Sequence, residues 1–230
     1  MKTVTWLSPH DAPEWFPPLE QALDEPPGLL AAGGDLSSPR LLAAYQRGIF
    51  PWYSPGQPVL WWSPDPRAVL FPEEFNCSRS LAKTLRNGGF EVVVDRDFAA
   101  VIDACAAPRP HAPGTWITSE MRNAYLRLHR LGMAHSIEAW RAGKLAGGLY
   151  GVRLGGVFFG ESMFSRERDA SKVALAHLVE VCLRNSIGVI DCQLPSPHLA
   201  SLGSRTIPRL QFQALLREHI SLEPAFLHPP

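Results

Sequence analysis

Three side chains near two expected strands could do chemistry on a cationic or amine-bearing substrate. Glu161 lies within residues 156–164, whose sequence GVFFGESMF otherwise resembles a buried strand. A buried carboxylate is costly unless it meets a partner, so Glu161 must have something to bind. Asp191 ends the next expected strand, 188–192, and Gln193 follows two residues later. Two acids and an amide near one sheet edge could hold a cationic substrate or take a proton from an amine.

Both acids also have structural alternatives. Glu161 could form a salt bridge with Arg166 or Arg168, which follow it closely in the sequence. Asp191 could cap the turn expected at residues 194–197, where two prolines interrupt the chain. The residue types alone leave both possibilities open.

Side-chain alternation along the second strand separates its polar residues. It places Gln193 on the same side as Asp191, if the strand continues, and Cys192 on the opposite side. Cys192 has no evident histidine partner, so core packing is the better interpretation of it than a nucleophile. A triad of Ser162, His135 and Asp191 can be assembled on paper, but no nucleophile-elbow motif supports it.

Tryptophan is abundant, and two of the seven residues are candidates for stacking on a flat ligand. Trp52 lies in a loop between two prolines, and Trp116 stands just before an expected helix start. Stacking on a nucleobase contributes about 1–3 kcal/mol per base. Trp61 and Trp62 are instead expected to pack at an interface between domains.

An α+β fold is expected to position these residues. After residue 66, the pattern predicts three consecutive strands joined by short turns, then a long amphipathic helix and a further strand. This order indicates a mixed, largely antiparallel sheet like that of the acetyltransferase-like (GNAT) fold. The expected strands are 68–71, 90–95, 134–140, 144–154, 156–164 and 188–192, and the expected helices are 78–86, 97–106, 118–132, 170–185 and 209–220.

The start of the chain differs in composition, which indicates two domains: residues 1–66 as a small N-terminal domain and residues 67–230 as the GNAT-like domain. Thirteen of the 22 prolines and five of the seven tryptophans fall in the first 72 residues. One helix is predicted there, over residues 37–48, with a serine cap, an early proline and a closing glycine. The segment that follows, GIFPWYSPGQPVLWWSPDPR (48–67), should be ordered but irregular, because proline disfavours both helix and central strand.

The composition is that of a globular protein without net charge. The 230 residues include 46% hydrophobic residues, 22 basic residues and 22 acidic residues. Neutrality argues against a protein that coats long nucleic acids, but it allows a local basic patch for an RNA end. The four cysteines have no C-x-x-C spacing, so neither a zinc site nor a redox motif is expected. With no secretory signal or membrane-spanning run, we expect a cytoplasmic protein with reduced thiols.

Four blocks of unusual composition make the sequence similar to a known family. They are GGDLSSPRLLAAYQRGIFPWYSPGQPVLWWSPDPRAVL, GTWIT, GGLYGVRLGGVFFGESMFSRERDASKVAL and IDCQLPSPHLASLGSRTIPR. Taken in order, they make the chain resemble a leucyl/phenylalanyl-tRNA–protein transferase from about Leu29 to Arg209. The resemblance implies a small N-terminal domain, a GNAT-like second domain, no metal, no CoA or other cofactor, and a cytoplasmic location.

The same resemblance implies a reaction and its partners. Members of the family transfer leucine or phenylalanine, and less readily methionine, from aminoacyl-tRNA to the amino group of a protein that begins with arginine or lysine. The product is marked for degradation in the bacterial N-end rule pathway. Nothing in the sequence requires more than a monomer, and no membrane partner is indicated.

Site residues are implied by their positions in the matching blocks. Glu161, Asp191 and Gln193 match functional positions, and Trp52 and Trp116 match positions near the aminoacyl-adenosine end of the tRNA. The basic residues expected to contact tRNA, on a helix that is more basic in some relatives, are Arg79, Lys83 and Arg86. The residues that match the apolar slot for the transferred side chain are Leu149, Phe158, Met163, Leu175, Leu178 and Ile190.

The chemistry of the implied reaction requires placement more than activation. An aminoacyl ester is already activated, so a covalent enzyme intermediate is not required. We expect the Gln193 side-chain oxygen to accept a hydrogen bond from the attacking amine, while Asp191 orients Gln193 or receives the proton. Glu161 would set the negative field or anchor the acceptor.

Two other functions stay open at this point. One is a CoA-dependent N-acetyltransferase on the same fold, although the place of its glycine-rich pyrophosphate loop reads SRERDASK. The other is a non-enzymatic module that uses the tryptophans for an RNA end and the acids for an N-terminal arginine.

Overall fold

The computed structural model describes residues 2–108, 115–221 and 227, and these form two β-sheets with helices packed on them. The N-terminal sheet has four strands and the second sheet has seven. This mixture of helices and strands confirms the predicted α+β class. The expected N-terminal domain begins at residue 1 and the expected second domain ends with residues 228–230; these residues lie outside the described ones.

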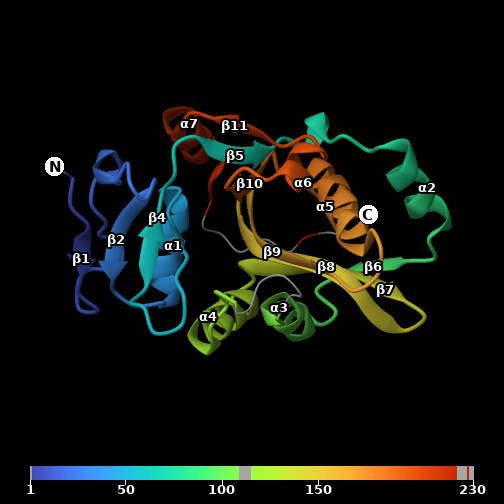
Figure 1. Ribbon diagram of the computed structural model, residues 1–230, viewed down its shortest axis with the longest axis horizontal. Helices are drawn as coiled ribbons and strands as arrows, with labels where there is room; N and C mark the ends of the chain where they lie inside the picture. The colour runs from blue at the N-terminus through green and yellow to red at the C-terminus, as the bar shows by residue number, and fades with distance from the viewer. Residues whose placement is uncertain (1, 109–114, 222–226, 228–230) are drawn as a thin grey trace.

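Short strands build the N-terminal sheet, which lies at one end of the molecule (Figure 1). Its elements are β1 (Thr5–Leu7), a 3-10 turn (Leu19–Gln21), β2 (Leu29–Gly33), α1 (Ser38–Gln46), β3 (Phe50–Pro51) and β4 (Leu60–Trp62). The strand order is β1-β2-β4-β3, with β1 and β2 parallel and the other pairs antiparallel. The expectation of an irregular segment was therefore wrong. Pro51 is compatible with a sheet because it lies in the edge strand β3.

The seven-stranded sheet carries the predicted meander. Its order is β11-β5-β10-β9-β8-β7-β6. Only β9 and β10 pair in parallel, which confirms a mixed, largely antiparallel sheet. The strands are β5 (Arg67–Leu70), β6 (Glu91–Val94), β7 (Ala134–Arg141), β8 (Lys144–Leu154), β9 (Val157–Ser165), β10 (Val189–Gln193) and β11 (Arg205–Ile207).

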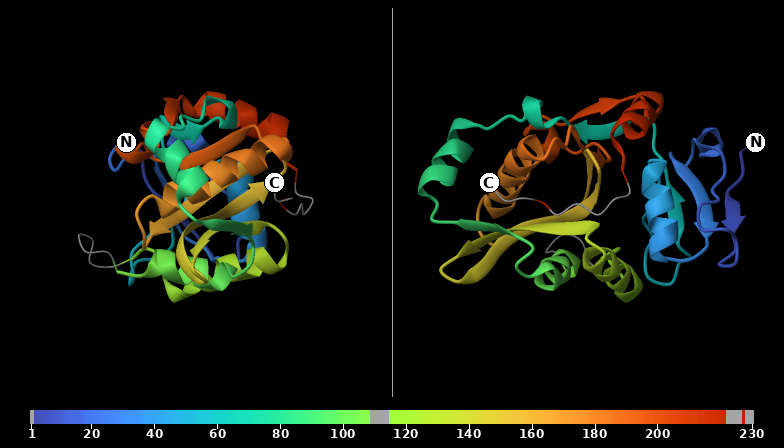
Figure 2. Two further views of the ribbon diagram at one scale, coloured as in Figure 1. Left: turned by 90° about the vertical axis from the view of Figure 1, so that its right-hand side faces the viewer. Right: turned by 180° about the vertical axis from the view of Figure 1, so that it is seen from behind.

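Helices cover both faces of this sheet. Helix α5 packs on one face, and α3 and α4 pack on the other, as the end-on and rear views also show (Figures 1 and 2). The side chains of Ser78, Asp97 and Thr118, at the starts of predicted helices, accept backbone N–H groups and cap α2, α3 and α4. The serine cap expected for the N-terminal helix was wrong, because α1 already includes Ser38 and its N-cap residue Ser37 makes no side-chain capping bond. The helices of this part are α2 (Arg79–Asn87), α3 (Phe98–Ala106), α4 (Ser119–Arg130), α5 (Ala170–Arg184), α6 (Pro197–Ala200) and α7 (Arg209–His219), with a 3-10 turn at Pro72–Glu74.

The parallel strands β9 and β10 stay paired over only part of their length. Their pairing runs from Val157 to Phe159 on β9, although β9 continues to Ser165. The order β7-β8-β9-α5-β10 is the one predicted for a GNAT-like core. The end of the paired stretch brings Asp191, at the last paired position of β10, close to Gly160 and Glu161 on β9.

The apolar core is divided by the large sheet and is continuous between the two sheets. One cluster joins side chains of the N-terminal sheet and α1 to α3 and α4, and a second lies between the sheet and α5. We propose a domain boundary at the cis Asp65–Pro66 bond, between β4 and β5, because each side of it carries its own sheet. In the described residues, no helix is long and apolar enough to cross a membrane.

Candidate active site

Two cavities meet where β9 and β10 part. The first has a volume of about 140 Å³, and the second about 240 Å³. Glu161, Cys192 and Gln193 line both of them. The other walls of the first cavity are Leu149, Tyr150, Gly160, Ser162, Met163, Leu175, Leu178, Ile190, Asp191 and Leu199. The other walls of the second are Phe50, Pro51, Trp52, Trp116 and Leu194.

The first cavity gathers most of the residues expected to form the apolar slot. Five of the six predicted residues line it: Leu149, Met163, Leu175, Leu178 and Ile190. Phe158 does not, because it is fully buried and its ring packs on Gly151, where an added Cβ would lie 2.5 Å from that ring. Leu199, which the sequence reasoning missed, lines the cavity from α6.

Glu161 occupies a β-bulge that turns its carboxylate toward the N-terminal part of the chain. Gly160 and Ser162 face successive residues of β8, so Glu161 has no partner residue on that strand. Tyr45 of α1 donates to its Oε1 at 2.7 Å, and Tyr125 of α4 donates to its Oε2 at 2.6 Å. The partners of the Glu161 carboxylate are therefore two tyrosines from separate parts of the chain.

The salt bridge considered for Glu161 is not formed. Arg166 donates instead to the backbone oxygen of Leu145, and Arg168 lies near Asp169. The proposed alternative was wrong because the bulge directs Glu161 away from the arginines that follow it in the sequence.

Counting protons shows that this cluster favours a protonated Glu161. The hydroxyl oxygens of Tyr45 and Tyr125 also lie 2.6 Å apart, so the three groups make three close contacts. Two hydroxyls supply only two protons, and an ionised carboxylate supplies none. The third contact is satisfied when Glu161 carries a proton.

Electrostatics agree with the proton count. Burial raises the pKa of Glu161 to about 7, and the charge of Asp191 adds to the rise. The hydrogen bonds from Tyr125 and Tyr45 and the charge of Arg67 lower this pKa, but they do not offset the burial. Glu161 therefore titrates near neutral pH, where a general base or acid works best.

Replacing Glu161 by glutamine should change how stability depends on pH. Because the folded pKa is about 7 and the ordinary value is 4.5, the folded state binds more protons between these pH values. The free energy of unfolding of the wild type should therefore fall as pH rises through this window, by on the order of 3 kcal/mol. Glu161→Gln keeps one donor and one acceptor in the cluster permanently and should lack this fall. The free energy of unfolding of both proteins, measured by urea unfolding at pH 5 and pH 8, checks this prediction. If it changed equally between the two pH values in the wild type and in the variant, that would contradict a raised pKa of Glu161.

Asp191 is a fully buried acid with a fully buried partner. Arg67 of β5 donates from Nε to Oδ1 at 2.7 Å and from Nη2 to Oδ2 at 2.6 Å. Oδ1 also accepts the backbone N–H of Gln193 at 3.0 Å. Both oxygens are therefore occupied, and this bonding favours the orienting role of Asp191 over that of a proton acceptor.

Gln193 reaches the cavities through an irregular backbone. Its φ is +57°, a left-handed value that is uncommon outside glycine, and the pairing of β10 with β5 shifts between Asp191 and Gln193. The regular alternation assumed from the sequence does not hold here. Asp191 is buried against Arg67, whereas Gln193 is partly exposed to both cavities.

Cys192 lines both cavities, but burial disfavours ionisation of its thiol. Burial, followed by the charge of Asp191, raises the pKa of this thiol to about 12, so little thiolate forms at neutral pH. The Ser162, His135 and Asp191 triad is not assembled either, because His135 pairs with Asp95 and Asp191 pairs with Arg67. A thiol or hydroxyl nucleophile is thus disfavoured.

Cys192→Ser is expected to keep its activity. The variant should work within about threefold of the wild type, because a thiol with so high a pKa is a poor nucleophile. A folded but inactive variant, measured in the transfer assay described below, would support Cys192 as a nucleophile that forms a covalent intermediate with the transferred amino acid.

The tryptophans at the second cavity stand near each other. Trp52 is 41% exposed. Trp62 donates from Nε1 to the Trp52 backbone oxygen, and the two ring centroids lie 5.6 Å apart. Trp116 is partly buried and lines the same cavity. The expected stacking residues are therefore brought together at the cavity that adjoins the apolar one.

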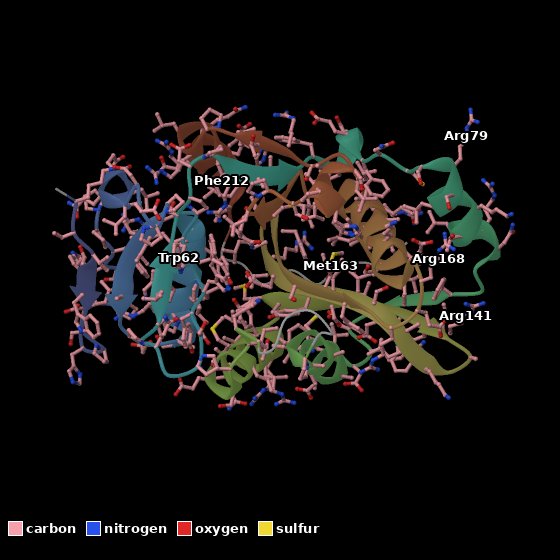
Figure 3. The ribbon with its side chains drawn as sticks, viewed as in Figure 1. Trp62, Arg79, Arg141, Met163, Arg168 and Phe212 are labelled. Atoms are coloured by element: carbon pink, nitrogen blue, oxygen red, sulfur yellow. The ribbon has the colours of Figure 1, made fainter. Side chains whose placement is uncertain are left out.

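The basic residues of α2 lie apart from these tryptophans. Arg79, Lys83 and Arg86 are all exposed. In Figure 3, Arg79 lies at the end of the molecule opposite Trp62, with Met163 between them, and Arg141 and Arg168 lie on the same side as Arg79. Contact of α2 with an RNA bound at the tryptophans would require an RNA that extends along the molecule.

Besides Leu199, the sequence did not predict the partners of the two acids: Tyr45, Tyr125 and Arg67. Their partners lie 116, 36 and 124 residues away in the sequence, so no local spacing relates them. The only signal was their place in the pattern, since both tyrosines fall on the buried face of a helix and Arg67 begins a buried strand. In residues 2–108, 115–221 and 227, no group of three or more possible metal ligands occurs.

Comparison with known proteins places this chain in the aminoacyltransferase class of enzymes. A relative in Azotobacter vinelandii, called leucyl/phenylalanyl-tRNA–protein transferase, is 61% identical to this chain, over 90% of this chain and 92% of its own length. Two further relatives carry the same name. The relative in Stutzerimonas stutzeri shares 58% identity over 94% of this chain and 95% of its own length. That in Chromohalobacter salexigens shares 60% over 95% of this chain and 84% of its own length.

Family comparison names the group. Residues 34–65 match the leucyl/phenylalanyl-tRNA protein transferase N-terminal domain, and residues 69–217 match the leucyl/phenylalanyl-tRNA protein transferase family. The chain belongs to this family, as its four sequence blocks predicted.

Solved structures add little. A GCN5-related N-acetyltransferase from Kribbella flavida is 9% identical, with a TM-score of 0.39 over 72% of this chain and 59% of that protein. L-PGS from Bacillus licheniformis is 10% identical, with a TM-score of 0.41 over 71% of this chain and 54% of that protein. Likenesses of this size carry no argument about fold or function.

Proposed function

We propose that this enzyme moves leucine or phenylalanine, and less readily methionine, from aminoacyl-tRNA to the N-terminal α-amine of proteins that begin with arginine or lysine. The observation that carries the proposal is the pair of adjoining cavities, one apolar and one flanked by tryptophans, that share Glu161, Cys192 and Gln193. One cavity suits an esterified apolar side chain, and the other suits a nucleoside. The reacting ester would then lie at the shared wall.

The apolar cavity accounts for the choice of donor. Most of its lining side chains are apolar, and Glu161 and Asp191 are the charged residues among them; the uncharged polar ones are Tyr150, Ser162, Cys192 and Gln193. Each methylene in such a pocket contributes only about 1–3 kcal/mol, so the slot should accept leucine, phenylalanine and methionine alike. Rejection of β-branched side chains is then a matter of shape.

Filling the slot should remove phenylalanine before leucine. Leu149 is buried in the cavity wall, and Leu149→Trp adds a large ring to it. We expect transfer of phenylalanine to fall at least about tenfold more than transfer of leucine, because the larger side chain loses its space first. The measurement is kcat/KM with Phe-tRNA and with Leu-tRNA. Leu183→Trp, on the exposed face of α5, is the matched control, and equal losses for both donors would contradict the assignment of the slot.

The rest of the donor is proposed to bind beyond the shared wall. Trp52 and Trp116 offer apolar rings for the terminal adenosine of the tRNA, for which stacking contributes about 1–3 kcal/mol per base. Arg79, Lys83 and Arg86 would contact the phosphates of the tRNA body from α2. Because that contact is electrostatic, it should weaken as salt is raised.

The two acids have different tasks in the proposed step. The acceptor α-amine has an ordinary pKa of about 7.7–8.0, so a fair fraction is neutral near pH 7. Its nitrogen forms a bond with the ester carbonyl carbon, the bond from that carbon to the ribose oxygen breaks, and one proton moves from nitrogen to the ribose oxygen. Gln193 positions the amine through its side-chain oxygen, and Asp191 positions Gln193. Glu161, with a pKa of about 7, accepts the proton and returns it to the leaving oxygen.

Acceptor choice is proposed to be electrostatic. Asp191 is neutralised by Arg67, so Glu161 is the acid at the shared wall that keeps no buried cation of its own. A cationic first residue of the acceptor would lower the energy of the ionised form of Glu161.

The proposal also covers the assembly, the location and the fate of the products. All proposed site residues come from one chain, so we propose that the enzyme acts as a monomer. We place it in the cytoplasm, where aminoacyl-tRNA is found, and propose that its products are marked for degradation.

One assay separates the proposal from its two alternatives. The purified chain is incubated with labelled Phe-tRNA and an arginine-starting peptide, with and without CoA. Label in the peptide without CoA supports the proposed transfer. A requirement for acetyl-CoA supports an N-acetyltransferase, and binding of tRNA or peptide without transfer supports a binding module.

A further inference from the structure

Arg67 is the buried charge in this site that the proposed reaction does not use. It is 1% exposed, and among the described residues the other fully buried arginine is Arg40, in the N-terminal part of the chain. Arg67 is not among the residues that line either cavity. A charged side chain held so completely out of water requires a full set of partners.

The guanidinium of Arg67 has partners in three separate parts of the fold. Nε and Nη2 hold both oxygens of Asp191, and Nη1 donates to the backbone oxygen of Gly48 at 2.9 Å, just past the end of α1. Its Cζ lies over two aromatic rings, 4.9 Å from the centroid of the Phe50 ring and 4.7 Å from that of the Phe212 ring of α7. Such a planar group, bonded along its edges and packed on aromatic rings, is fixed in orientation.

The surroundings are built to let these partners approach. Gly48 has a φ of +73°, and a Cβ at that position would lie 3.0 Å from the Phe212 ring. Phe50, whose ring packs on the guanidinium, also lines the second cavity next to Trp52. Arg67 is thus anchored on the same loop that presents the tryptophan.

Asp191 passes this fixed orientation to Gln193. Its Oδ1 accepts both the Nε–H of Arg67 and the backbone N–H of Gln193. Gln193 needs such a bond, because its left-handed backbone is unfavourable for a residue other than glycine and must be held by its neighbours. The chain of contacts runs from Gly48 through Arg67 and Asp191 to the side chain at the shared wall of the two cavities.

From these contacts, we infer that Arg67 is a positioning residue for the transfer reaction: it fixes Asp191 so that this carboxylate holds the left-handed Gln193 against both substrates. The inference rests on the proposed function. It predicts that the shape of the arginine fork matters as well as its charge, because lysine has a single point charge and cannot bond both oxygens in the same geometry.

The test compares Arg67→Lys with the matched buried control Arg40→Lys. Arg40 is 0% exposed and bonds Asp35 and the backbone oxygens of Ser8 and Asp11, and it lines neither cavity. With labelled Phe-tRNA and an arginine-starting peptide, kcat of Arg67→Lys should fall at least about tenfold below that of Arg40→Lys, because small misplacements in a site are costly. KM for both substrates should change by less than about threefold, because neither substrate touches Arg67. A smaller fall in kcat, or a loss confined to KM, would overturn the inference.

A second variant covers the case in which Arg67→Lys does not fold. Arg67→Gln/Asp191→Asn replaces the buried ion pair by two neutral amides, so no unpaired charge remains inside. If Arg67 acts through Asp191, the double variant should match Asp191→Asn in kcat within about threefold. The inference would be overturned if kcat of the double variant were about tenfold below that of Asp191→Asn. It would also be overturned if both of these variants had a near-normal kcat. Failure of the wild type to transfer label would instead refute the proposed function, so the two failures are distinguishable.

Discussion

Glu161→Gln is expected to abolish most of the transfer activity while leaving the protein folded. The glutamine amide can accept from one tyrosine and donate to the other, so it completes the cluster of Tyr45, Tyr125 and residue 161 without an ionisable proton. What it removes is a base that titrates near pH 7. A positioned general base typically contributes about 10²–10⁴-fold, and kcat should fall by that factor.

The steady-state constants also distinguish two tasks for Glu161. If it accepts the proton of the amine, kcat falls and KM for the peptide changes little; if it binds the acceptor's cationic side chain, KM rises. The wild-type rate should also increase with pH through about 7 as Glu161 ionises. The variant should keep only the rise set by the acceptor α-amine, whose ordinary pKa is about 7.7–8.0. Tyr150, Asp191 and Arg67 are the other ionisable groups that act on this cluster, and all three remain in the variant. Glu180→Gln, at an exposed position of α5, serves as the control. A kcat within about threefold of the wild type would remove Glu161 from the proton transfer.

Asp191→Ala is expected to damage both turnover and stability. Removal of the carboxylate leaves the guanidinium of Arg67 buried without its partner, which costs about 3–5 kcal/mol. It also releases the backbone N–H of Gln193, so the amide side chain loses its position and kcat should fall about 10²-fold. Binding of tRNA should persist, because the tryptophans and α2 are untouched.

A second aspartate–arginine pair supplies the control for this variant. Asp103 accepts two bonds from Arg122 in the same fork geometry, but the aspartate is 53% exposed. Asp103→Ala should change stability by less than about 1 kcal/mol and leave transfer unchanged. The measurements are thermal unfolding, tRNA binding and single-turnover transfer. Near-normal transfer by a folded Asp191→Ala would exclude Asp191 from the mechanism.

Helices and meander strands were predictable because their signals are local. Ser78, Asp97 and Thr118 cap the helices that follow them, and the hydrophobic alternation from residue 134 to 164 gives three strands in sequence. The N-terminal sheet was missed because its strands have only two to five residues and one contains Pro51. Such strands exist through tertiary pairing and leave almost no periodic signal.

The candidate site was only partly predictable, for a related reason. The apolar slot follows from side chains on neighbouring strands and one helix, so most of its residues could be named from the matching blocks. The partners of the two acids could not, because Tyr45 and Arg67 come from distant parts of the chain. The bulge at Glu161 and the left-handed Gln193 both break the alternation on which strand reasoning depends.

The most direct test of this account is a crystal structure of the chain with a stable analogue of the donor end, an adenosine whose 3′ position carries phenylalanine through an amide. We predict that the benzyl group lies among Leu149, Met163 and Leu178, that the adenine lies against Trp52 or Trp116, and that the carbonyl carbon lies at the wall shared by Glu161 and Gln193. A benzyl group bound outside the apolar cavity, with Glu161 and Gln193 remote from the carbonyl, would contradict the account.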